Sequence, residues 1–163
     1  MNQMEGMLAR LRSVSDRFPA EERAKFLSGA STEAIDGLQA LLPVPLPNDF
    51  VTFLSVCEAV IAMNVWNGYW VGGIVNVTRS VLHPVYSTKV PDEAEESAVV
   101  PIAADGGGND FLLALRSGQV WKRDHETGNA RIVAASFTDF LGRVAEDWEH
   151  FLSGDDSWRY LSG

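Results

Sequence analysis

Three consecutive glycines at residues 106–108 constrain this chain most strongly, because they lie between two apolar runs of strand length, 99–103 and 111–115. The remaining loop positions include Asp105, Asn109 and Asp110. Glycine adopts positive φ without a Cβ clash, and Asp and Asn side chains hydrogen-bond to nearby backbone groups in turns. The pattern therefore predicts a tight β-hairpin. Replacing a glycine of positive φ with Val is expected to destabilise the fold more than Asp105→Asn.

The same pattern continues along the chain. Ser117-Gly118 separates the second run from residues 119–123, and Thr127-Gly128 separates that segment from residues 131–134. Turn residues between runs of this length are typical of an antiparallel meander. Asp124, His125 and Glu126 are expected at the strand end that enters the last of these turns.

Apolar residues at helical spacing mark helices at both ends of the chain. Residues 4–18 form one stripe, preceded by a capping box of Asn2 and Glu5. Short helices are expected after Pro19 and after Thr32. The last helix begins after Ser136, and its buried side comprises Phe137, Phe140, Leu141, Val144, Trp148, Phe151 and Leu152.

The middle of the chain combines one helical stripe with two short β-prone runs. A helix from Asn48 is predicted to present an apolar face that continues through Cys57 to Val60 and Ile61. Residues 69–71 and 74–77 are β-prone, and the Gly72-Gly73 pair between them indicates a bulge or a tight bend. Residues 91–97 are polar and acidic, which favours an exposed loop or the first turn of a short helix.

Two blocks of the sequence resemble the SUKH superfamily. One is Leu-Pro-Asn-Asp-Phe-Val-Thr-Phe-Leu at 46–54, and the other runs from Ile-Ala-Ala-Asp-Gly-Gly-Gly-Asn-Asp-Phe at 102–111 to Phe-Leu at 140–141. Ala135 is a departure, because the pattern has Asp before the Ser-Phe pair. The resemblance implies an α+β domain that binds proteins: in bacteria chiefly immunity proteins that neutralise toxins, and in fungi a regulator of cell-wall signalling. It implies no catalysis.

The expected architecture is a single α+β, SUKH-like domain over residues 1–163. N-terminal helices occupy residues 1–45, the family core residues 46–152 and a C-terminal tail residues 153–163. The core is expected to hold a mostly antiparallel sheet of about four to six strands, with the C-terminal helix packed on it.

Charge and composition narrow the range of partners. The formal net charge is −9, and residues 31–163 carry all of the excess negative charge. This argues against direct binding of nucleic acid and suits a basic protein, although a solvated acidic surface that maintains solubility explains the charge equally simply. There is no signal peptide and no apolar run long enough to cross a membrane, so a cytoplasmic protein is expected.

Known catalytic and metal-binding motifs are absent. The glycine loop lacks the Lys and Ser or Thr of a phosphate-binding loop, and its acidic residues lack the spacing of an EF-hand. His125-Glu126 begins like a zinc-protease motif, but Asn129 stands where the second His belongs. The single cysteine, Cys57, is expected to pack as a small hydrophobic residue. No cofactor is expected.

The predicted function is a non-catalytic, protein-binding immunity domain for a cognate toxin, such as a nuclease. A regulatory scaffold without a toxin partner and a small enzyme using carboxylates near Asp105 are the alternatives. Trp66 and Trp70 flank a turn, where they serve either as core residues or as interface anchors. The candidate partner-binding residues are Trp66, Trp70, Asp92, Glu93, Glu95, Glu96, Asp105, Asn109, Asp110, Asp124, His125 and Glu126.

Overall fold

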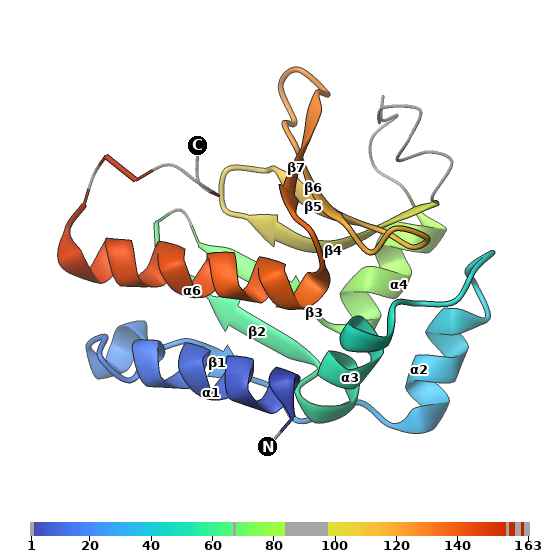
Figure 1. The fold of residues 1–163 in the computed structure, drawn as a ribbon, viewed down its shortest axis with the longest axis horizontal. Coiled ribbons are helices and arrows are strands. Elements are labelled where there is room, and N and C mark those ends of the chain that lie inside the picture. The colour runs from blue at the N-terminus through green and yellow to red at the C-terminus, as the bar shows by residue number, and fades with distance from the viewer. Residues whose placement is uncertain (1, 67, 84–97, 156, 159–160, 162–163) are drawn as a thin grey trace.

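The computed structural model describes residues 2–66, 68–83, 98–155, 157–158 and 161. Within them, the chain forms one antiparallel sheet whose strands follow the order of the chain, β1 to β7, and helices pack against it (Figure 1). The strands are β1 Lys25–Phe26, β2 Ala59–Ala62, β3 Tyr69–Gly72, β4 Val99–Asp105, β5 Asp110–Ala114, β6 Val120–Arg123 and β7 Ala130–Ala134. The predicted α+β class and the meander from β4 to β7 are confirmed.

The sheet has seven strands, one more than the largest number expected. The additional strand is β1, whose two residues pair with Ile61 and Val60 of β2. So short a strand carries no period-two pattern that a sequence could reveal.

Five α-helices and one 3₁₀ turn lie in the described residues. They are α1 Gln3–Ser15, η1 Ala20–Glu22, α2 Thr32–Gln39, α3 Asn48–Val56, α4 Ile74–Leu82 and α6 Phe137–Ser153. The capping box of Asn2 and Glu5 opens α1 as predicted. Ser136 Oγ caps α6 by accepting the Asp139 N–H at 3.0 Å, so the departure at Ala135 leaves this cap intact.

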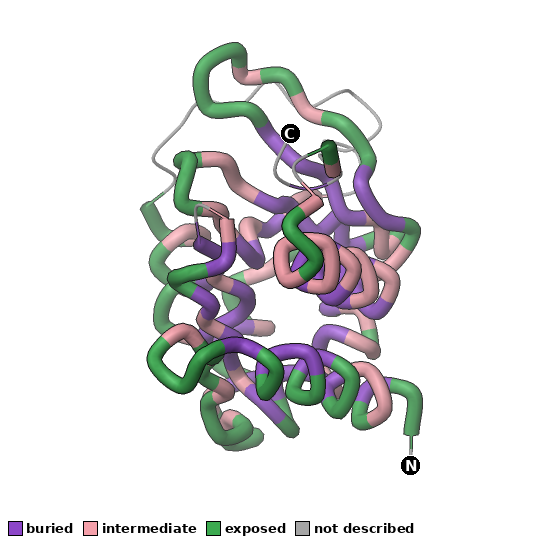
Figure 2. The backbone as a smooth tube through the Cα atoms, turned by 90° about the vertical axis from the view of Figure 1, so that its left-hand side faces the viewer, coloured by how far each residue is buried: buried purple, intermediate pink, exposed green. Residues whose placement is uncertain are grey.

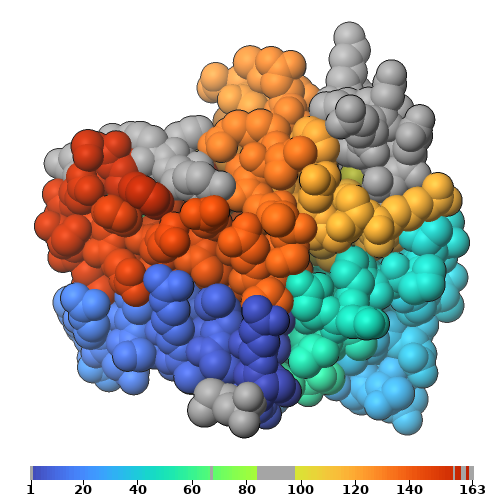
Figure 3. Space-filling model, in the orientation of Figure 1, coloured from blue at the N-terminus to red at the C-terminus, as the bar shows by residue number. Residues whose placement is uncertain are grey.

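Helices α1 and α6 lie side by side, and α6 also packs against the sheet (Figures 1 and 3). Arg10 of α1 and Glu149 of α6 form an ion pair at 3.3 Å on the outer surface. Buried segments of the helices and the strands alternate with exposed ones along the chain (Figure 2), and most of the buried apolar side chains form one main core. There, the Phe137 ring lies 4.9 Å from the rings of both Phe50 and Phe53, so aromatic side chains join α3 to α6.

The prediction that the helix from Asn48 extends to Ile61 is wrong. Helix α3 ends at Val56, Cys57 is extended with φ −149°, and Val60 and Ile61 lie on β2. One apolar run serves a helix and then a buried strand, and periodicity alone does not separate the two. Cys57 is fully buried, as expected, and burial raises the pKa of its thiol.

Residues 74–77 are helical rather than β. The bend expected at Gly72-Gly73 is present, since these residues have φ of +77° and +85° and redirect the chain from β3 into α4. A Cβ at Gly72 would lie 2.5 Å from the Glu58 carbonyl oxygen, so only glycine fits there. Helix α4 buries Val77, and this packing overrides the β propensity of its branched residues. The acidic segment 91–97 lies outside the described residues.

Candidate functional site

The β4–β5 loop is organised by the side chain of Asp105. Its Oδ1 accepts the backbone N–H groups of Gly107 and Asn109 at 2.9 and 3.0 Å, and its Oδ2 accepts the Asn109 amide Nδ2 at 3.1 Å. Gly108 has φ of +88°, whereas Gly106 and Gly107 do not have positive φ. The predicted hairpin is therefore confirmed, with one position that requires glycine and a carboxylate as its centre.

The β6–β7 loop is built around Asp124 in a similar way. Its Oδ1 accepts the backbone N–H groups of Glu126 at 2.7 Å and Thr127 at 3.0 Å. These hydrogen bonds favour the charged form and hold the pKa of the Asp124 carboxyl below its ordinary value. The side chain of Glu126 is 79% exposed, and its Oε1 lies 4.0 Å from His125 Nε2.

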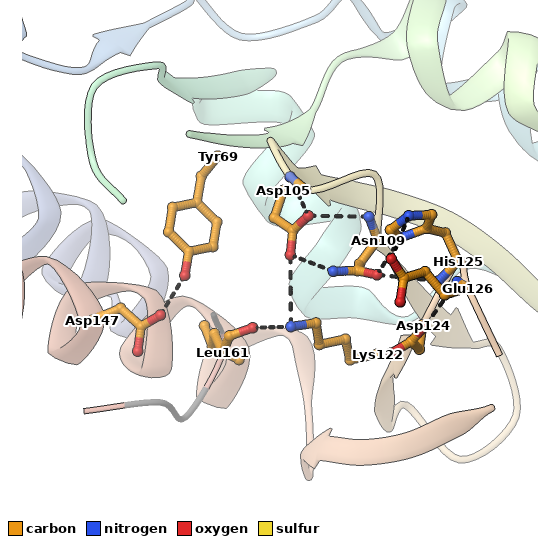
Figure 4. A network of polar contacts seen from close by, with 10 residues as sticks. Tyr69, Asp105, Asn109, Lys122, Asp124, His125, Glu126, Asp147 and Leu161 are labelled. Atoms are coloured by element: carbon orange, nitrogen blue, oxygen red, sulfur yellow. Dashed lines mark hydrogen bonds and ion pairs between the residues drawn. The ribbon is translucent and has the colours of Figure 1, made fainter. Parts of the chain in front are cut away.

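Asn109 joins the two loops (Figure 4). Its Oδ1 accepts the His125 backbone N–H at 3.1 Å and also lies 3.0 Å from His125 Nδ1. Because Asn109 Nδ2 donates to Asp105, Oδ1 is the acceptor here and Nδ1 of the imidazole carries a proton. Residues 106–109 and 124–127 thus form one continuous surface, which we call the paired-loop surface.

Beneath this surface, Asp105 pairs with a buried lysine. Lys122 Nζ lies 3.6 Å from Asp105 Oδ2, and the two side chains are only 6% and 7% exposed. Lys122 Nζ also donates to the carbonyl oxygen of Leu161. Burial lowers the pKa of the Lys122 ammonium, and the nearby Asp105 charge opposes this effect. Asp105 is consequently an internal structural group.

Asp110 is also engaged internally. It forms an ion pair with Arg123, which stands opposite it in the register of β5 and β6. Among the acidic residues predicted in these two hairpins, Asp124 and Glu126 are exposed, whereas Asp105 and Asp110 are held by neighbouring cations.

Asp147 of α6 is a second buried polar group, and it is not among the residues predicted from the sequence. It is fully buried, and its carboxylate accepts hydrogen bonds from the Tyr69 hydroxyl and from Trp158 Nε1. Burial raises the pKa of the Asp147 carboxyl despite these bonds, and burial next to this charge raises the pKa of Tyr69. Its position between Val144 and Trp148 on the apolar stripe of the last helix was a usable signal.

The two tryptophans proposed as anchors are partly buried. Trp66 Nε1 donates to the Asp147 carbonyl oxygen at 3.2 Å, and its ring meets the Phe151 ring edge-on at 5.2 Å. Trp70 lies on β3, and its indole nitrogen is buried. Both side chains pack against the main core, and the turn between them accepts the Gly106 N–H at the Gly68 carbonyl oxygen, at 2.9 Å.

Four candidate residues, Asp92, Glu93, Glu95 and Glu96, lie outside the described residues. In the described part of the chain, no group of three or more His, Cys, Asp or Glu side chains is arranged to hold a metal ion. No described helix has the length and hydropathy of a membrane span.

A search of curated protein sequences finds no match to the chain. The sequence profile of the SMI1 / KNR4 family (SUKH-1), by contrast, matches residues 29–143, well over half of the chain and the whole of the region from α2 to β7. The resemblance seen in the two sequence blocks is confirmed, and the chain belongs to the SMI1/KNR4 (SUKH-1) family.

Proposed function

We propose that this protein is a non-catalytic immunity protein that neutralises a cognate toxin by binding it directly. The observation that carries the proposal is family membership over residues 29–143, since SUKH proteins include toxin immunity proteins. An immunity protein of this kind acts in a stoichiometric complex and covers the active site or another essential surface of its toxin.

We propose that the toxin binds at the paired-loop surface. Its residues include the carboxylates of Asp124 and Glu126 and contain no Lys or Arg. The glycines at 106 and 107 are exposed, so a partner backbone approaches closely there. The excess of acidic groups on the chain favours a basic toxin, such as a nuclease, because opposite charges accelerate association.

Two other groups of residues remain proposed contacts. The acidic set Asp92, Glu93, Glu95 and Glu96 rests on the sequence alone. Trp66 and Trp70 are half-buried, and aromatic side chains with one accessible edge are common anchors in interfaces.

The test is co-expression with the product of an adjacent toxin gene. We expect growth to be rescued in proportion to the amount of this protein, with a stoichiometric complex after purification. Glu126→Lys should lower the association rate by repelling the basic partner, and higher salt should lower it for the native protein. Asp36→Lys, at an exposed position on α2, is the matched control and should have a smaller effect.

Two alternatives give different outcomes. A regulatory scaffold would form stable complexes with other proteins and give no rescue. An enzyme would protect at sharply sub-stoichiometric levels, and a folded Asp124→Ala or His125→Ala variant would lose about 100-fold or more of that protection. The internal engagement of both Asp105 oxygens supports binding over the catalytic role considered for this carboxylate.

A further inference from the structure

The C-terminal tail enters the polar network under the paired-loop surface. Gly154, with φ of +71°, ends α6 and turns the chain back. Trp158 then stacks on His150, with ring centroids 3.9 Å apart and planes within 7°, and its Nε1 donates to Asp147. Leu161 is fully buried in the main core. The tail is therefore anchored at both of these residues.

These two anchors complete the surroundings of two buried charges. Trp158 donates to the Asp147 carboxylate, and the Leu161 carbonyl oxygen accepts from the Lys122 ammonium. A buried charge that loses a hydrogen-bonding partner is costly, so the docked tail and the buried positions of these two side chains stabilise one another.

Lys122 connects the tail to the paired-loop surface. From the Leu161 carbonyl the contacts run through Lys122 Nζ to Asp105 Oδ2 at 3.6 Å, and from Asp105 to Asn109 at 3.1 Å. Asn109 then holds His125 through contacts of 3.0 and 3.1 Å (Figure 4). Every step is a hydrogen bond or an ion pair, and the path ends at the paired-loop surface.

We infer that the docked C-terminal tail controls the shape of the paired-loop surface through Lys122. In the docked state Lys122 is fixed beside Asp105, and Asp105 fixes the backbone of the β4–β5 loop. When the tail leaves, water reaches the ammonium, Lys122 moves off Asp105, and the loop loses the constraint that aligns Asn109 with His125. Lys122, Trp158 and Leu161 are thus positioning residues. Their effect on a partner rests on the proposed function, but the coupling itself does not.

The test uses the full-length chain and needs no partner. Amide hydrogen exchange is followed by NMR at Gly107, Asn109 and His125, whose N–H groups make the hydrogen bonds of the loops. In Trp158→Ala and Leu161→Ala, protection at these three amides should fall about tenfold. The Gly118 amide, in the turn between β5 and β6, donates to Ala114 at 2.8 Å and reports general loss of stability. Its protection should change less.

Ser157→Ala is the matched control in the tail, because this hydroxyl donates to Asp155, two residues away in the tail itself. It should leave all four amides unchanged. Trp158→Ala and Leu161→Ala variants that open the tail with unchanged protection at Gly107, Asn109 and His125 would overturn the inference, as would equal loss at Gly118.

Lys122→Met keeps the test decisive should the tail variants fail to fold. The inference requires this change to shift both the loop amides and the Trp158 indole N–H, at the two ends of the path. A shift at only one end would contradict it. A toxin that binds the Glu126→Lys variant at an unchanged association rate would refute the proposed contact surface. That result would not contradict the coupling between the tail and the loops.

Discussion

Asp49 of α3 binds Thr138 of α6 at two points: its Oδ2 accepts the Thr138 backbone N–H at 2.9 Å and the Thr138 hydroxyl at 3.1 Å. Its other oxygen accepts the N–H of Phe50 at 2.8 Å. One carboxylate thus satisfies donors in the first turns of two helices, where negative charge is also favoured by the helix dipoles.

Asp49→Ala should lower the free energy of unfolding by about 1–2 kcal/mol, because three donors lose their acceptor. Urea unfolding monitored by circular dichroism measures this loss. Asp49→Asn retains an acceptor oxygen and is the control, so it should cost less. Equal stability of native protein and Asp49→Ala would show that water replaces the carboxylate without cost.

Breaking the ion pair between Lys122 and Asp105 should lower the free energy of unfolding by more than Asp49→Ala does. Asp105→Ala leaves a buried ammonium without its counter-charge, and breaking a buried pair in this way costs about 3–5 kcal/mol. Asp110→Ala should cost less, because the Asp110 side chain is 22% exposed and water compensates part of the lost ion pair. The comparison uses urea unfolding of both variants, and the reverse order would show that Asp105 is not the centre of the loop.

The sequence predicted those parts of the fold that local chemistry determines. The meander from β4 to β7 follows from its turn residues, and α6 follows from Ser136 and a long apolar stripe. The assignments failed at Val60 and at residues 74–77, where apolar or branched residues fit a helix and a strand equally well and tertiary packing decides between them.

The site was predictable to a similar extent. Asn109, Asp124 and His125 were expected in neighbouring turns, but their direct connection depends on the register of the sheet. The internal role of Asp110 depends on Arg123, which faces it across β5 and β6. That of Asp105 depends on Lys122, which lies on β6, two strands away from β4. Nothing in the local sequence reports such pairings. The domain boundaries expected at residues 46 and 152 remain a prediction.

The loop glycines should differ from one another in their tolerance. Gly108→Ala places a side chain at φ of +88°, close to the His125 ring, and should cost about 1–2 kcal/mol. Gly107→Ala is the matched control, since this exposed residue does not have positive φ, and its effect should be small. Thermal unfolding of the two variants measures the difference, and equal melting temperatures would contradict the assigned loop geometry.

The lowered pKa of Asp124 gives a pH dependence of defined sign. The hydrogen bonds from Thr127 and Glu126 favour its carboxylate, so the folded state binds this proton less readily than the unfolded chain does. The resulting stabilisation is present above the ordinary value of 3.8 and is lost as the pH falls through the lowered folded-state pKa. Melting temperatures of native protein and Asp124→Asn measure it, because Asn keeps an acceptor oxygen and lacks the charge. The native protein should melt higher at pH 7, and the gap should close in acid because protonated Asp124 is also neutral. A gap of the same size at pH 7 and at pH 2.5 would show that the carboxylate charge does not stabilise this turn.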